Sequence, residues 1–166
     1  MGLLFVFGSC SWFASTKKGP QDRASTIAWI ENDYQRAMEA ARAQGKPLLI
    51  DAWAPWCHTC LSMRAFVLTD PSLAAMSDRF IWVAVDTEKL ENAPVLAQFP
   101  VEAWPTFFIV DPVSEKVQGR WLGAASVQQF RAFLEDGERA MANDHRENDP
   151  PLLVRRGDLA AIEGRH

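Results

Sequence analysis

A short apolar run that leads directly into a pair of cysteines constrains this chain more than any other feature. Residues 48–53 read LLIDAW, the kind of run that forms a strand buried on both faces of a sheet, with Asp51 as its one charged member. Residues 54–60 read APWCHTC and hold two of the three cysteines in the 166-residue chain. Apolar residues after the pair indicate a helix that runs on from Cys57. The cysteine pair is therefore predicted at the start of a helix that follows a central strand.

The rest of the chain alternates between helical and strand patterns. A first helix is indicated by the helical spacing of Ile30, Tyr34, Ala37, Met38 and Ala41, with Asn32 or Asp33 as its cap and Gly45 as its stop. The other expected elements are a short helical piece from Asp70 to Met76, a strand over 80–85, a short helix over 93–98, strands over 106–110 and 117–122, and a helix from about Ser126. This layout predicts an α/β fold with a central mixed sheet flanked by helices.

Length and composition indicate one domain with extensions at both ends. With 166 residues, 48% of them hydrophobic, the chain can bury one sizeable core, and we place the domain at residues 26–142. Residues 143–161 are expected to form a linker or helical tail. Residues 162–166, IEGRH, resemble a factor Xa cleavage site followed by the start of a purification tag, so we treat them as a tag remnant.

The N-terminal extension, residues 1–25, contains a possible targeting signal. The stretch LLFVFGSC resembles the end of a lipoprotein signal, in which Cys10 would carry a lipid anchor. The alternative is an apolar N-terminal stretch that packs on the domain. Both interpretations stay open at this point.

Charge and cysteine content exclude several classes of function. A net charge of -4 without long basic runs argues against nucleic acid as a partner. Three cysteines are too few for the disulfide framework of a small secreted protein. We therefore expect the cysteines to react rather than to brace the fold.

The position of the pair predicts redox chemistry. At a helix N-terminus, unpaired N–H groups and the helix dipole stabilise an anion such as the Cys57 thiolate. Lowering a thiol pKa from about 8.5 to about 7 requires roughly 2 kcal/mol, which a partly buried helix end can supply. Cys60, one turn later, can form a disulfide with Cys57 and attack a mixed disulfide held there. Cys57 is thus the predicted nucleophile and Cys60 the resolving thiol.

Three other interpretations of the cysteine pair are possible but fit the sequence less well. A structural disulfide between residues three apart closes a very small loop and stabilises little. A zinc site needs about four ligands, and beyond His58, Cys10 and a distant His145 the chain offers nothing obvious, so no metal is expected. Two buried, inert thiols fit poorly with a segment that Pro55 and Trp56 place in a turn.

Two motifs together resemble a known family. Residues 51–60, followed much later by Trp104, Pro105 and Thr106, resemble the thioredoxin superfamily, over about residues 27–139. Within it, residues 45–47 and 60–73 are most similar to the C-terminal periplasmic domain of thiol:disulfide interchange proteins and to stand-alone relatives. Those relatives pass electrons between protein dithiols.

The resemblance implies roles for further residues. Pro105 would be the cis-proline beside the active site, leaving the backbone of Trp104 free to pair with an extended substrate segment; the alternative is an ordinary strand-entry proline. Asp51 would be a buried, unpaired carboxylate that takes the Cys60 proton; the alternative is an exposed aspartate at a sheet edge. Trp56 would shield the disulfide and help dock substrates, unless it is a core tryptophan.

Departures from the family pattern leave the direction of electron flow open. Thioredoxins carry a lysine facing the buried acid, and Trp82 occupies the matching position here, so Asp51 is expected to lack a cation and to have a further raised pKa. His58 and Thr59 replace Gly-Pro between the cysteines, and the His58 imidazole beside Cys57 would favour an oxidant. His58 and Thr59 are also among the expected substrate-binding residues.

Together these features predict a thiol:disulfide oxidoreductase, acting in the reductase direction. Its partners would be protein dithiols or disulfides and an upstream thiol electron donor, with no cofactor beyond the Cys57–Cys60 disulfide. We expect a monomer in the periplasm or another extracytoplasmic compartment, with the cytoplasm as the alternative. A disulfide-donating oxidase or isomerase, or a thioredoxin-fold protein-binding module, remains the alternative function. The binding-module alternative is based on residues 151–160, PLLVRRGDLA, which resemble the first turns of a helix in a following segment.

Overall fold

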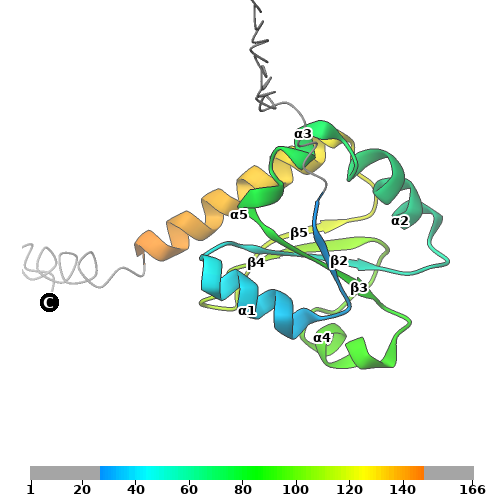
Figure 1. Cartoon of the computed structure of the whole chain (residues 1–166), viewed down its shortest axis with the longest axis horizontal. Coiled ribbons are helices and arrows are strands. Elements are labelled where there is room, and N and C mark those ends of the chain that lie inside the picture. Colours follow the sequence, from blue (N-terminus) through cyan, green and yellow to red (C-terminus); the bar gives the residue numbers. More distant parts are fainter. Residues whose placement is uncertain (1–26, 148–166) are drawn as a thin grey trace, which may run out of the picture.

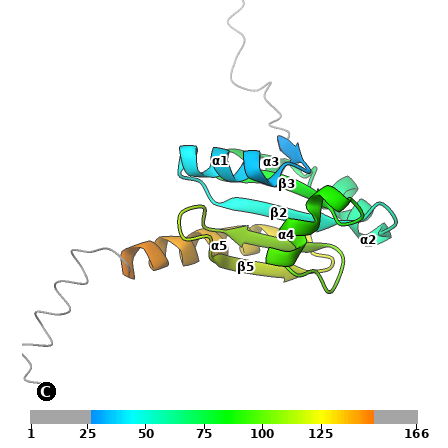
Figure 2. The ribbon, with the colours of Figure 1, turned by 90° about the horizontal axis from the view of Figure 1, so that it is seen from below.

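Five strands form one mixed sheet in the computed structural model, which describes residues 27–147. The strands are β1 (Trp29–Glu31), β2 (Leu48–Trp53), β3 (Ile81–Asp86), β4 (Thr106–Val110) and β5 (Val117–Leu122). Their order across the sheet is β1-β3-β2-β4-β5, and Figure 2 shows β3, β2 and β5 following one another toward the lower edge. β3 pairs in parallel with β1 and β2, whereas β4 runs antiparallel to β2 and β5. The predicted α/β fold is confirmed, with β2 in the middle of the sheet.

Helices cover both faces of this sheet (Figure 1). One face carries α1 (Tyr34–Gln44) and α4 (Ala93–Gln98), whose apolar residues pack on Leu48, Ile50 and Ala52 of β2. The other face carries the π-helix η1 (Met63–Val67), α3 (Pro71–Ala74) and α5 (Val127–Glu147), which share a core with Leu49. The remaining helical elements are α2 (His58–Ser62) and the short 3₁₀ turns η2 (Ser77–Arg79) and η3 (Leu90–Asn92). The result is three layers with a separate core on each side of the sheet.

Strand alternation decides which way Asp51 points. Successive residues of a strand project to opposite faces, so Asp51 and Trp53 share the face of Leu49. That is the face on which η1 and α5 lie. The one charged residue of the central strand is therefore directed toward the helical segment that follows the cysteines.

The predicted helix boundaries correspond to observed caps. The Asp33 carboxylate accepts a hydrogen bond of 3.1 Å from the backbone N–H of Arg36 at the start of α1. Gly45 ends α1 in the left-handed conformation, at a φ of 62°, which glycine adopts without steric cost. Asp70 caps α3 in the same way by accepting from the N–H of Ser72. These local signals placed both helices correctly.

Two observed elements differ from the expected ones. Ile30, which the helical spacing places in the first helix, instead lies in β1, where it pairs with Val83 of β3. A strand of three residues is too short to show an alternating pattern in the sequence. At the other end, α5 continues to Glu147, past the expected domain boundary at residue 142.

Several predictions fall on residues 1–26 and 148–166, outside the described part of the chain. They are the lipid anchor at Cys10, most of the C-terminal tail and the tag remnant. Within residues 27–147, no helix is both long and apolar enough to cross a bilayer.

Candidate active site

The two cysteines of the APWCHTC motif form a disulfide at the start of α2. Cys57 is the N-cap of this helix, and its Sγ accepts a hydrogen bond of 3.1 Å from the backbone N–H of Cys60. The two Cα atoms are 5.3 Å apart, a normal distance for a disulfide. Cys60 is buried, whereas Cys57 keeps 6% of its surface exposed. A partner can therefore reach Cys57 more readily than Cys60.

Two tryptophans flank the disulfide. Trp104 packs against the small cluster of Ala54 and the two cysteines, and its ring centroid is 5.3 Å from that of Trp56. The indole Nε1 of Trp104 donates to the hydroxyl of Thr87 at 2.9 Å, which fixes the ring. Trp56 is 55% exposed, so it belongs to the surface beside the cysteines and not to the core.

The segment that carries Pro105 reaches the site through the pairing of β4 with β2. Thr106 lies opposite Ala52, close to the point where β2 ends and the cysteine motif begins. The Trp104–Pro105 peptide bond is cis, and Pro105 is buried. His58 and Thr59, between the cysteines, are exposed. The structure thus brings Trp56, Trp104 and the cysteine pair together at one end of the sheet.

Asp51 is buried and has a cation as its partner, which corrects the expectation of an unpaired acid. The Nε of Arg64, on η1, donates to Oδ2 of Asp51 at 3.2 Å, and its Nη2 lies 3.1 Å from the same oxygen. Only the Nε contact has hydrogen-bond geometry, because Nη2, although buried, has no suitably aligned acceptor among residues 27–147. Oδ1 of Asp51 accepts no hydrogen bond from any residue in the range 27–147. Arg64 therefore binds Oδ2 of Asp51, and Oδ1 has no partner within this range.

Burial raises the pKa of Asp51 to about 6, because the charged form loses its hydration. The Arg64 guanidinium acts in the opposite direction, through its charge and its hydrogen bond, and the negative charge of Glu31 adds a small further rise. A carboxyl group with this pKa changes its protonation state just below neutral pH. Such a group can both accept and release a proton under physiological conditions.

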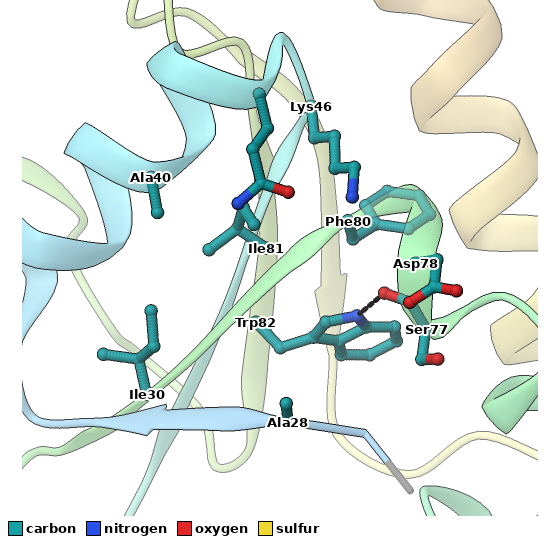
Figure 3. Close-up of a pocket in the computed structure, with 10 residues that line it drawn as sticks. Ala28, Ile30, Ala40, Lys46, Ser77, Asp78, Phe80, Ile81 and Trp82 are labelled. Carbon is teal, nitrogen blue, oxygen red and sulfur yellow. Dashed lines mark hydrogen bonds between the residues drawn. The ribbon is translucent and has the colours of Figure 1, made fainter. Parts of the chain in front are cut away.

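Trp82 explains why the cation does not come from β3. Its ring lies in the core on the α5 side of the sheet, and its Nε1 donates to the backbone oxygen of Ser77 at 2.9 Å (Figure 3). This tryptophan forms part of the lining of a pocket of about 320 Å³ beside β1. None of the predicted site residues lines that pocket. The position expected to hold a lysine is therefore committed to packing, and η1 supplies the cation instead.

Sequence reasoning missed Arg64. A signal was present, because Arg64 follows Cys60 by four residues and so occupies the same side of the helical segment one turn later. As for metals, the described part of the chain contains no group of three or more His, Cys, Asp or Glu side chains that could hold an ion.

Comparisons with known proteins agree with this geometry. The family described as thioredoxin-like matches residues 29–112, and the chain belongs to that family. A thiol:disulfide interchange protein, DsbD, from Pseudoalteromonas atlantica is 22% identical over 81% of this chain. The reduced C-terminal domain of DsbD from Neisseria meningitidis is 25% identical, with a TM-score of 0.55 over 65% of this chain and 99% of that domain. A thioredoxin from Thermus thermophilus has a TM-score of 0.59 at 24% identity, over 69% of this chain and 86% of that one. The resemblance inferred from the motifs is thus confirmed.

The chain spans only part of the curated relatives. It covers 23% of the length of the Pseudoalteromonas protein. The similarity therefore concerns one thioredoxin-like domain of those longer proteins.

Proposed function

We propose that this protein is a thiol:disulfide oxidoreductase that exchanges disulfides with other proteins through Cys57 and Cys60. The observation that carries the proposal is the disulfide at the helix start, with a slightly exposed Cys57 and a buried Cys60. The similarity to DsbD proteins, whose name describes thiol:disulfide interchange, supports the same activity.

In the reducing direction the reaction begins with the Cys57 thiolate. It attacks one sulfur of a partner disulfide, forms a mixed disulfide and releases the other partner sulfur as a thiolate. Cys60 then loses its proton to Asp51 and attacks Sγ of Cys57. The partner leaves as its second thiolate, and the Cys57–Cys60 disulfide forms. Two electrons have passed to the partner, and an upstream dithiol must return two electrons to begin the next cycle.

The partner is proposed to dock beside the disulfide. Trp56 offers an exposed aromatic surface, and the ring of Trp104 packs against it. The backbone around Trp104 and Pro105 would pair with an extended segment of the partner, next to the exposed His58 and Thr59. An extracytoplasmic location, which derives from the family resemblance and from the signal-like stretch before Cys10, completes the proposal. The domain is proposed to begin near residue 26 and to end with α5, which runs to Glu147.

Three variants test the activity in an insulin-reduction assay with dithiothreitol. Cys57→Ser is expected to abolish turnover, because the nucleophile is lost. Cys60→Ser is expected to accumulate mixed disulfides, which can be identified by mass spectrometry. Ser62→Ala, an exposed change on the same helix, serves as the matched control and should turn over normally. Full activity of Cys57→Ser would refute the mechanism, and no turnover by the wild type would favour a protein-binding module.

A redox titration then determines the direction. Equilibration with graded glutathione buffers, followed by thiol trapping of Cys57 and Cys60, yields the reduction potential. A value of about -270 mV or lower indicates a reductant, as proposed, whereas a value of about -120 mV indicates a disulfide donor.

A further inference from the structure

Arg64 is held more firmly than a surface arginine. Its guanidinium carbon lies 3.8 Å from the centroid of the Trp53 ring and 5.8 Å from that of Trp29. The same guanidinium also contacts Asp51: its Nε lies 3.2 Å and its Nη2 3.1 Å from Oδ2. Its side chain is only 27% exposed. Stacking on aromatic rings and pairing with a carboxylate together fix the orientation of this cation.

The local backbone explains how a charged residue reaches this position. Arg64 lies in η1, where the chain continues from α2 as a π-helix instead of an α-helix. In this segment Met63 is buried in the core, whereas Phe66 is 77% exposed. Arg64 is intermediate in exposure between these two, and its guanidinium contacts the carboxylate of Asp51 on β2. A π-turn inside a helix is rare and frequently occurs at functional sites.

We propose that Arg64 is a positioning residue that keeps Asp51 ionised, with one carboxylate oxygen fixed and the other free to accept the proton of Cys60. This inference rests on the proposed thiol:disulfide exchange and identifies the residue that controls its proton step. Arg64 itself touches neither cysteine in the mechanism and acts only through Asp51.

The two oxygens of Asp51 have different surroundings that suit this role. Oδ2 is engaged by Arg64, and Oδ1 has no hydrogen-bond partner among residues 27–147. When Cys60 attacks the mixed disulfide, its S–H bond breaks and the proton passes to the free oxygen. The new S–S bond to Cys57 forms as the bond from Cys57 to the partner sulfur breaks, so no additional oxidant or reductant is required. Without Arg64, burial would favour the neutral acid, which cannot accept this proton.

The charged groups that act on Asp51 come from two elements. Arg64 of η1 stabilises its ionised form, and Glu31 of β1 opposes that form. Trp53, on the same strand as Asp51, contributes an uncharged ring. A change at Arg64 should therefore alter the titration of Asp51 more than a change at any other described side chain.

The test is a carboxyl ¹³C NMR titration of Asp51 in the reduced full-length protein. Arg64→Gln is expected to raise the Asp51 pKa by at least about one unit, because an adjacent opposite charge lowers a carboxyl pKa by about one to three units. Arg64→Lys should retain most of the wild-type value. Arg131→Gln, which removes an exposed arginine paired with Glu135 on α5, is the control and should change nothing.

A kinetic measurement distinguishes positioning from a structural role. The measurement is the rate at which Cys60 resolves a preformed mixed disulfide, as a function of pH. In Arg64→Gln the midpoint of this pH profile should rise by the same amount as the NMR midpoint of Asp51. Rescue of both midpoints by Arg64→Lys would support the proposal. An unchanged Asp51 titration, or a shifted titration with an unchanged rate profile, would overturn it.

Two further controls keep the outcomes separate. If Arg64→Gln does not fold, Arg64→Met, which retains the apolar stacking on Trp53, replaces it with the same expected shift. Failure of the proposed function would show as absent turnover in the wild type itself, whereas failure of this inference would show as normal wild-type turnover with midpoints that do not depend on Arg64.

Discussion

Two aspartates are almost completely buried at different places along the sheet, and their surroundings differ sharply. Asp51, in β2, is 1% exposed, and Asp111, directly after β4, is fully covered. Asp111 has partners for both oxygens: the N–H of Val113 donates to one at 3.0 Å, and the hydroxyl of Ser114 donates to the other at 2.6 Å. Nε2 of His145, near the end of α5, lies 2.9 Å from that second oxygen. Within the described part of the chain, Arg64 contacts one oxygen of Asp51 and the other oxygen has no hydrogen-bond partner.

This difference reverses the effect of burial on the pKa. Burial alone would raise the pKa of Asp111, but the hydrogen bonds from Ser114, Val113 and His145 together lower it. For Asp51 burial dominates and raises the pKa to about 6. A buried carboxylate whose two oxygens both have hydrogen-bond partners thus stays ionised and serves as a structural charge. A buried carboxylate with only one oxygen bound remains able to exchange a proton. We expect Asp111 to stabilise the fold and Asp51 to serve the reaction.

The largest expected effect comes from Asp111→Ala. This change leaves the donors of Val113 and Ser114 without an acceptor, and we expect it to lower the free energy of unfolding by about 4 kcal/mol. Urea unfolding at pH 7 measures the loss. Because the folded-state pKa of Asp111 is lowered, its contribution is present above the unfolded pKa and is lost as pH falls through the folded value.

The control for Asp111→Ala is Asp78→Ala, an exposed aspartate whose loss should change stability by less than about 0.5 kcal/mol. The folded fraction of Asp111→Ala should still reduce insulin at the normal rate. Lost activity with unchanged stability would reverse the roles assigned to the two aspartates.

A smaller effect of opposite sign is expected from Asp51→Asn. The rise of the Asp51 pKa from 3.8 to about 6 means that its ionised form costs about 3 kcal/mol of stability at pH 8. Because the folded-state pKa is the higher one, stability falls as pH rises from about 4 to about 6. Asp51→Asn removes the charge, so we expect it to be more stable than the wild type at pH 8 by up to about 3 kcal/mol, with most of this gain absent at pH 4.

Urea unfolding of the oxidised protein at pH 4 and pH 8 checks this prediction, with Asp78→Asn as a matched control that should show no such difference. Resolution of the mixed disulfide should meanwhile slow by about 100-fold, the usual contribution of a general base. A variant that is less stable than the wild type at pH 8 would show that Asp51 is a structural charge like Asp111.

Local patterns predicted most of the fold but not the partners of these aspartates. Strands β2, β4 and β5 appear at the predicted bounds of 48–53, 106–110 and 117–122. Apolar runs mark β2 and β4, and the turn at Asp111 and Pro112 indicates β5 as the hairpin partner of β4. The same reasoning found the cysteine pair, since its chemistry is local to one turn. The three-residue β1 was missed because it is too short to show an alternating pattern and its position depends on pairing with β3.

The cation of Asp51 could not be inferred in the same way. The contact with Arg64 depends on the π-turn of η1 and on strand alternation in β2, so it exists only in the assembled fold. Likewise, the contact between Asp111 and His145 joins the β4–β5 turn to the far end of α5. Tertiary contacts of this kind decide whether both oxygens of a buried acid have partners. A sequence pattern of period two or 3.6 shows on which side of an element a residue such as Arg64 lies, but not which residue it contacts.

The smallest expected effect comes from Glu31→Gln. This variant tests whether the pKa of Asp51 is controlled by long-range charge or by direct contact with Arg64. Glu31 is exposed on β1 and acts on Asp51 only through its charge, so the variant should lower the Asp51 pKa by a few tenths of a unit. Screening should reduce even this shift at 0.5 M salt, because the Debye length is then only about 4 Å. Carboxyl NMR titrations at low and high salt measure it, with the exposed Glu91→Gln as a control of equal charge. A Glu31 effect as large as that of Arg64 would mean that long-range charge, and not the single contact with η1, distinguishes Asp51 from Asp111.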